Sequence, residues 1–180
     1  MLPALINRIE LLKIDYEIII VDDGSEKPVT ISEYENDRCK LLTNKKNYGK
    51  GYAVKRGILH SSGDEIIFMD GDFPFNLSVI DIACKSIIQP GIDMIIGDRT
   101  LPTSSYARVP IIRFFGSKII SFIVSRFFTI GYYDTQCGIK GFNRAIALNI
   151  FSKVTINGFS FDVEVIFIAL KRKYRIEKIP

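Results

Sequence analysis

Two short apolar runs, each ending in carboxylates beside a glycine, constrain the fold of this chain more than any other feature. Residues 18–21 (IIIV) precede DDGS at 22–25, and residues 66–69 (IIFM) precede DGD at 70–72. Short runs rich in β-branched residues indicate strands that are buried on both faces, as in parallel sheets. Such sheets bind ligands outside the carboxyl ends of their strands, where both acidic clusters are expected to lie.

The second cluster has the composition of a site for a divalent cation. Asp70 and Asp72 flank Gly71, which lets the backbone approach a ligand closely. Mg²⁺ is commonly held by one or two carboxylates together with substrate phosphates, so a nucleotide carrying a diphosphate is the expected ligand. The alternative is a solvated turn in which an aspartate caps the next helix.

Strand-like and helical segments alternate along the chain. The apolar patterns predict helices at 2–13, 49–61 and 76–89, a last helix opening at 159–164, and strands at 17–21, 40–43, 65–69, 92–97 and from 176 onward. This alternation predicts βαβ units, hence an α/β fold with a largely parallel sheet. The glycine-punctuated segment 132–142 is predicted to be a loop between helices.

Composition narrows the class of protein. With 180 residues, 47% of them hydrophobic, residues 1–180 are expected to form one domain. The net charge of +4 is mild and the cations are dispersed, so we expect no nucleic-acid partner. Three separated cysteines argue against a disulfide framework or zinc site and favour a cytoplasmic location. The chain lacks a P-loop motif and a complete dinucleotide fingerprint, and its single histidine, His60, is expected to be structural.

Residues 111–133 are unusually apolar and aromatic, yet three cations interrupt them, among them Arg113. No stretch of about 18 uncharged apolar residues occurs, so nothing in the sequence is predicted to span a bilayer. The mixture of aromatics, cations and a narrow serine stripe favours an amphipathic helix at a membrane interface. A buried helix of a larger domain is the alternative.

The motifs together resemble family-2 glycosyltransferases with the GT-A fold, in the branch of polyprenyl-phosphate sugar transferases that includes dolichyl-phosphate glucose and mannose synthases. The segments that carry this resemblance are VDDGS at 21–25, NYGKGYA at 47–53, DGD at 70–72, GDR at 97–99, DTQCGIK at 134–140 and FDVE at 161–164. The last two are the most specific, and they favour the glucosyl over the mannosyl side. The implied fold is a Rossmann-like, mostly parallel sheet flanked by helices.

The resemblance implies a metal-assisted, inverting transfer of a hexose, more specifically glucose from UDP-glucose, to a polyprenyl phosphate. It places Asp22 and Asp23 in the donor site, with Asp23 receiving the base or ribose. Asp70 and Asp72 would hold the donor's ribose and the Mg²⁺ or Mn²⁺ on its diphosphate. The lipid acceptor implies a peripheral location at the cytoplasmic membrane face.

The resemblance also suggests roles for residues elsewhere in the chain. Candidates to hold the diphosphate or the acceptor phosphate are Lys50, Arg99 and Arg113, each of which has the alternative of being a solvated surface cation. Asp134, Gln136 and Asp162 are the candidate catalytic residues. A phosphate monoester is largely dianionic at neutral pH and needs little help from a base. Asp134 and Gln136 are therefore expected to orient sugar or acceptor, although Asp134 would suit as a base for a hydroxyl acceptor. For Asp162, the alternative is simple complementarity to a helix dipole.

The chain departs from the family pattern in two ways. Family members begin with a further strand and continue past the last one, so we expect a core fragment whose strand at 17–21 has an open edge. Phe73 and Pro74 replace the Leu-Gln pair that commonly follows D-x-D in mannosyl-type members. Two alternatives to the lipid-directed enzyme therefore remain: an inactive or partner-binding fragment, and a transferase that acts on a polysaccharide hydroxyl.

Overall fold

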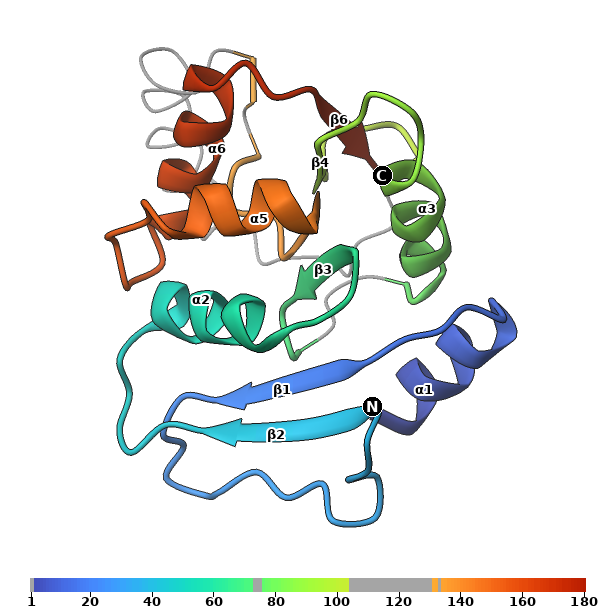
Figure 1. Ribbon diagram of the computed structural model, residues 1–180, viewed down its shortest axis with the longest axis vertical. Helices are drawn as coiled ribbons and strands as arrows, with labels where there is room; N and C mark the ends of the chain where they lie inside the picture. The colour runs from blue at the N-terminus through green and yellow to red at the C-terminus, as the bar shows by residue number, and fades with distance from the viewer. Residues whose placement is uncertain (1, 73–75, 104–130, 133) are drawn as a thin grey trace.

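The computed structural model describes residues 2–72, 76–103, 131–132 and 134–180 (Figure 1). The first part of the chain contains α1 (Leu2–Leu11), β1 (Ile18–Asp22), β2 (Cys39–Thr43) and α2 (Lys50–His60). The remainder contains β3 (Glu65–Met69), α3 (Ser78–Ile87), β4 (Met94–Gly97), β5 (Ile139–Asn143), α5 (Arg144–Phe151), α6 (Phe161–Lys171) and β6 (Ile176–Ile179). The predicted α/β alternation is confirmed.

The strands form a four-stranded sheet of order β3-β5-β4-β6 and a parallel pair, β1-β2. β4 and β6 are parallel, whereas β5 runs antiparallel to both of its neighbours. β3, β4 and β6 therefore share one direction, and β5 alone opposes it within this sheet. The prediction of a mostly parallel sheet flanked by helices is confirmed.

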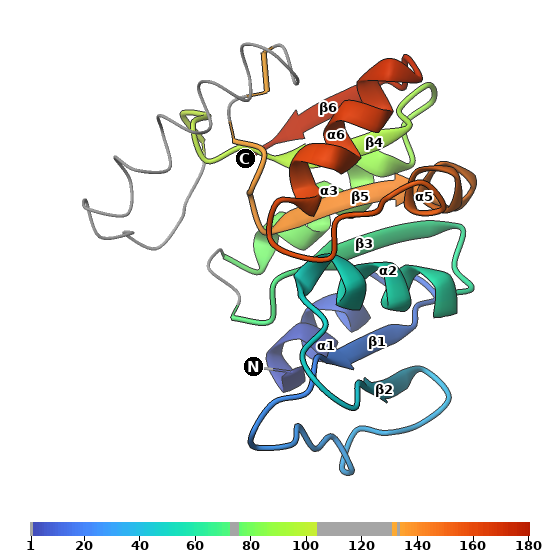
Figure 2. The same ribbon diagram turned by 90° about the vertical axis from the view of Figure 1, so that its left-hand side faces the viewer.

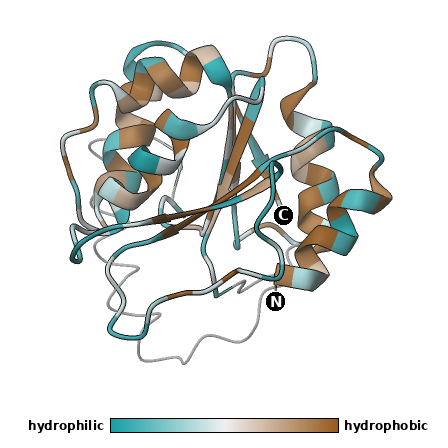
Figure 3. Cartoon of the chain, turned by 60° about the horizontal axis from the view of Figure 1, so that its bottom comes forward, coloured by the Kyte–Doolittle hydropathy of each residue, from teal (hydrophilic) through white to brown (hydrophobic). Residues whose placement is uncertain are grey.

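Helices cover both sides of the strands. α2, α5 and α6 lie on one side, and α1 and α3 lie on the other (Figures 1 and 2). β4 is buried along its whole length: Met94 and Ile96 pack toward the first group of helices and Ile95 toward the second. The strands between the two layers are accordingly largely hydrophobic (Figure 3). Apolar side chains thus cover both faces of the sheet, and polar side chains lie at the carboxyl ends of its strands.

β1 and β3 each have one edge without a strand partner among the described residues. β1 pairs only with β2, and β3 pairs only with β5. Except for Asp22, the side chains of β1 are only half-buried, in contrast to those of β4. The open edge expected beside the 17–21 strand is therefore present in the structure.

The segment 132–142 corrects one prediction. Its second half is β5, which pairs with β3 on one side and β4 on the other, and is not part of a loop. The sequence does not predict this strand, because Lys140 and Gly141 interrupt the apolar pattern that indicates the other strands. Gly141 is required there, since an added Cβ would lie 2.8 Å from Ile95 Cγ1.

Of the predicted interfacial helix at 111–133, the structure describes residues 131–132 alone, and the rest, Arg113 included, lies outside the described residues. Within the part of the chain that the structure describes, no helix is long and apolar enough to cross a membrane.

Candidate active site

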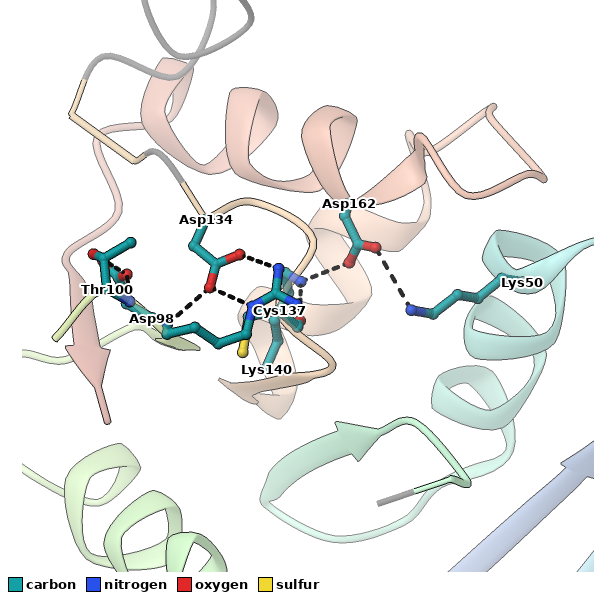
Figure 4. Close-up of polar contacts among 8 residues, drawn as sticks. Lys50, Asp98, Thr100, Asp134, Cys137, Lys140 and Asp162 are labelled. Atoms are coloured by element: carbon teal, nitrogen blue, oxygen red, sulfur yellow. Dashed lines mark hydrogen bonds and ion pairs between the residues drawn. The ribbon is translucent and has the colours of Figure 1, made fainter. Parts of the chain in front are cut away.

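Four charged side chains meet where the carboxyl end of β3 approaches the first turns of α2 and α6. Lys50 Nζ lies 2.7 Å from Asp70 Oδ1 and 3.8 Å from Asp162 Oδ2. The other oxygen of Asp162 lies 2.6 Å from Lys140 Nζ, so Asp162 sits between two lysines (Figure 4). The structure thus brings together three residues that the sequence proposed separately, Lys50, Asp70 and Asp162, and adds Lys140.

Glycines on both sides of Lys50 fix its position. Gly49 has φ 104, and a Cβ there would lie 2.4 Å from the carbonyl oxygen of Asn157. A Cβ on Gly51 would lie 2.4 Å from the carbonyl oxygen of Ile156. The Asn157 carbonyl also accepts a hydrogen bond from the Gly51 N–H at 2.7 Å. The first turn of α2 therefore packs directly on the loop that precedes α6. This packing places Lys50 close to Asp162.

Lys140 and Asp162 form a buried ion pair. Lys140 is 0% exposed and Asp162 is 1% exposed. Lys140 Nζ also donates to the carbonyl of Cys137 at 2.9 Å, which ties the loop before β5 to α6. Burial raises the pKa of Asp162, against the attraction of Lys140 and Lys50. The sequence pattern does not reveal this pair, because it predicts a loop at Lys140, whereas a strand places Lys140 on the same face as Phe142.

Gly138 leaves space for the Asp70 carboxylate. A Cβ at Gly138 would lie 2.7 Å from Asp70 Oδ2, and the Gly138 carbonyl accepts a hydrogen bond from the Asp70 N–H at 2.8 Å. The sequence CGIK therefore serves two neighbouring contacts: its glycine admits Asp70 and its lysine meets Asp162.

Arg99 and Asp134, proposed separately for the site, are paired with each other. Arg99 Nε donates to Asp134 Oδ2 at 2.8 Å and Arg99 Nη2 donates to Asp134 Oδ1 at 2.5 Å. The Arg99 N–H also donates to this carboxylate. Both oxygens of Asp134 are thus engaged, which suits a residue that orients its neighbours better than one that accepts a proton.

Asp98 supports the same edge of the sheet. Burial alone would raise its pKa, but hydrogen bonds from Thr100 and the ion pair with Lys178 hold the pKa below its usual range. Because Lys178 belongs to β6, this contact joins the end of β4 to the neighbouring strand.

The first acidic cluster, Asp22 and Asp23, accepts hydrogen bonds from the loops around it. Asp22 accepts hydrogen bonds from the Ser25 hydroxyl and N–H and from the Val29 N–H, which lower its pKa. Asp23 accepts from Asn44 Nδ2 and from the N–H groups of residues 48 and 49, directly before α2. In the structure both carboxylates order the loops beside the site, and their contact with a substrate remains a prediction.

Asp72 and Gln136 are both exposed, and Asp72 lies two residues beyond Asp70. Among the described residues, no group of three or more His, Cys, Asp or Glu side chains is arranged to hold a metal ion. In the described part of the chain, the carboxylates that follow β3 directly are those of Asp70 and Asp72. This donor set fits a hard cation that takes its other ligands from a diphosphate and water.

The model of glycosyl transferase family 2 matches residues 1–151 of the chain. The chain belongs to this glycosyltransferase family. It is 36% identical over 180 residues to a dolichyl-phosphate beta-glucosyltransferase of Dictyostelium discoideum, covering 93% of this chain and 55% of the relative. It is 32% identical over 176 residues to the human protein of the same description, covering 91% of this chain and 54% of the relative. The chain thus spans about half the length of these curated relatives.

The fold agrees with the family. A glucosyl-3-phosphoglycerate synthase from Mycobacterium tuberculosis, solved with Mn²⁺, UDP-glucose and phosphoglyceric acid, superimposes with a TM-score of 0.63 at 15% identity. The match covers 97% of this chain and 62% of the synthase. At this identity the likeness supports the fold alone, and that fold is GT-A.

Proposed function

We propose that this chain forms the donor-binding part of a transferase that moves glucose from UDP-glucose to a polyprenyl phosphate such as dolichyl phosphate. The observation that carries the proposal is the Asp70-Gly71-Asp72 turn at the carboxyl end of β3, with Lys50 placed 2.7 Å from Asp70. Carboxylates and a cation at one strand end suit a metal-bound diphosphate. The description of the relatives supports the choice of sugar and acceptor.

In this proposal, Asp70 and Asp72 hold Mg²⁺ or Mn²⁺ on the donor diphosphate. The cation, when bound, supplies charge neutralisation for the leaving nucleoside diphosphate. An oxygen of the acceptor phosphate attacks the anomeric carbon of the sugar while the bond from that carbon to the diphosphate breaks. Because the acceptor is already anionic, no side chain has to remove a proton, which agrees with the engagement of Asp134 by Arg99.

A lipid acceptor requires the protein to work at a membrane surface. We propose the cytoplasmic membrane face as the location and segment 111–133, most of which lies outside the described residues, as the contact. Its cations and aromatics support this assignment.

Replacement of Asp72 tests the proposed function. We expect Asp72→Asn to lower the rate of glucose transfer from labelled UDP-glucose to polyprenyl phosphate by about 10²-fold or more, because metal stabilisation of a leaving group contributes several kcal/mol. The exposed Asp37, in the loop before the amino end of β2, provides a control in Asp37→Asn, which has the same change in charge. Full activity of Asp72→Asn would contradict the proposal, and transfer to a soluble saccharide without lipid would overturn the choice of acceptor.

The open edges of β1 and β3 favour a second candidate, a fragment that binds no donor unaided. A half-buried strand with an unpaired edge exposes backbone N–H and C=O groups that can pair with another chain. Cooperative unfolding together with tight nucleotide binding would argue against this candidate.

A further inference from the structure

Lys50 occupies the position that a cation on Asp70 would need. Its ammonium group lies 2.7 Å from Asp70 Oδ1, and the side chains of Lys50 and Asp70 are only 19% and 30% exposed. Two positive charges cannot share this carboxylate oxygen at contact distance without strong repulsion. A divalent cation that binds at this oxygen therefore has to displace Lys50 from it.

The structure provides a second place for the displaced ammonium group. Asp162 Oδ2 lies 3.8 Å from Lys50 Nζ, while its other oxygen is held by Lys140. The rings of Phe159 and Phe161 lie 6.0 Å and 5.8 Å from the same Nζ. A small movement transfers Lys50 from Asp70 toward a buried carboxylate and two aromatic rings, all on the α6 side.

We propose that Lys50 is an exchangeable counter-ion of Asp70, and that it couples the binding of the divalent cation to the binding of the diphosphate. Without ligands, Lys50 neutralises Asp70 and weakens the site for a cation alone. When cation and diphosphate arrive together, Lys50 turns to Asp162 and the diphosphate. This inference rests on the proposed function, because it takes Asp70 as a ligand of the cation.

Charge in the cluster supports the exchange. Lys50, Lys140, Asp70 and Asp162 carry two positive and two negative charges, so Asp72 provides the only uncompensated charge of the site in the described residues. A single exposed carboxylate binds a divalent cation weakly, whereas a diphosphate supplies both oxygen ligands and negative charge. If Lys50 leaves Asp70 only when cation and diphosphate bind together, each ligand increases the affinity for the other. By linkage, the two effects on affinity are equal.

The backbone around Lys50 limits where its side chain can go. Lys50 is the first residue of α2, and the packing of its flanking glycines on the 156–158 loop fixes its Cα relative to Asp162. The ammonium group of Lys50 can therefore reach both Asp70 and Asp162 from one backbone position, as an exchanging group must.

The test compares Mn²⁺ binding to the wild-type chain, Lys50→Met and Lys50→Arg, with free Mn²⁺ followed by electron paramagnetic resonance. Without nucleotide, we expect Lys50→Met to bind Mn²⁺ about five- to tenfold more tightly, because a charge partner of Asp70 is removed. In the presence of UDP, we expect the variant to lose most of the coupling between UDP and Mn²⁺. Lys50→Arg keeps the charge and should retain weak binding of Mn²⁺ alone. Lys45→Met, at an exposed position, controls for the change in net charge.

The outcomes separate this inference from the proposed function. If wild type binds UDP with Mn²⁺ but Lys50→Met binds Mn²⁺ alone no more tightly, the exchange is wrong and the proposed function stands. If no variant binds Mn²⁺ with or without UDP, both are overturned. Circular dichroism checks that each variant is folded. If Lys50→Met does not fold, Lys50→Gln takes its place in the comparison.

Discussion

Lys140→Met is expected to lower the free energy of unfolding by about 3–5 kcal/mol, the usual cost of removing one partner of a buried ion pair. The substitution leaves Asp162 1% exposed with one of its lysines gone. It also removes the hydrogen bond to the Cys137 carbonyl, which ties the loop before β5 to α6. Urea unfolding followed by circular dichroism measures the change.

Two further variants identify the cause of that loss. Lys140→Met combined with Asp162→Leu removes both charges and should recover most of the stability, since well-packed apolar groups replace buried ion pairs at little cost. Lys171→Met, on the exposed side of α6, removes a lysine without a buried partner and should change stability by less than about 0.5 kcal/mol. A single variant Lys140→Met as stable as wild type would contradict the assigned role of the pair.

Gly51→Ala is expected to destabilise the chain by about 1–3 kcal/mol, although alanine favours helices. The added methyl group would lie 2.4 Å from the Ile156 carbonyl oxygen and 2.7 Å from Phe161 Cβ. α2 would have to move away from the loop before α6, which would separate Lys50 from Asp162. We therefore expect weaker UDP binding together with the lower unfolding midpoint.

Gly57→Ala provides a control in the same helix. A Cβ there would lie 3.3 Å from a single flexible side-chain atom, Val21 Cγ2. We expect a change of less than about 1 kcal/mol in stability and unaltered UDP binding. Equal effects of the two substitutions would show that the contact between Gly51 and the 156 carbonyl has no special importance.

Local composition was sufficient to predict most of the fold. The apolar runs at 18–21 and 65–69 are strands, and their acidic ends lie at the carboxyl edges as expected. Short buried strands have a strong local pattern because both faces demand apolar side chains, and the glycines that open α2 mark its start. The family resemblance rested on the same motifs and is confirmed.

Other features depend on contacts that no local pattern contains. β5 contains Lys140, which is explained by its ion pair with Asp162, and Gly141, which is explained by the close approach of Ile95. The pairing of Arg99 with Asp134 is similarly non-local, because each residue was a candidate to bind substrate and the structure shows them binding each other. Sequence patterns identified Lys50, Asp70 and Asp162 but missed Lys140, and they did not predict which of the charged side chains are partners.

In the function proposed for this chain, the carboxylates after β3 hold a nucleoside diphosphate through a divalent cation. Calorimetric titration of the chain with UDP and then GDP, each with and without Mn²⁺ at fixed salt, is the decisive experiment. We predict binding of UDP that requires Mn²⁺ and is lost in Asp72→Asn but kept in Asp37→Asn. Absence of binding to either nucleotide, or UDP binding that is indifferent to Mn²⁺ and to Asp72, would contradict the claim.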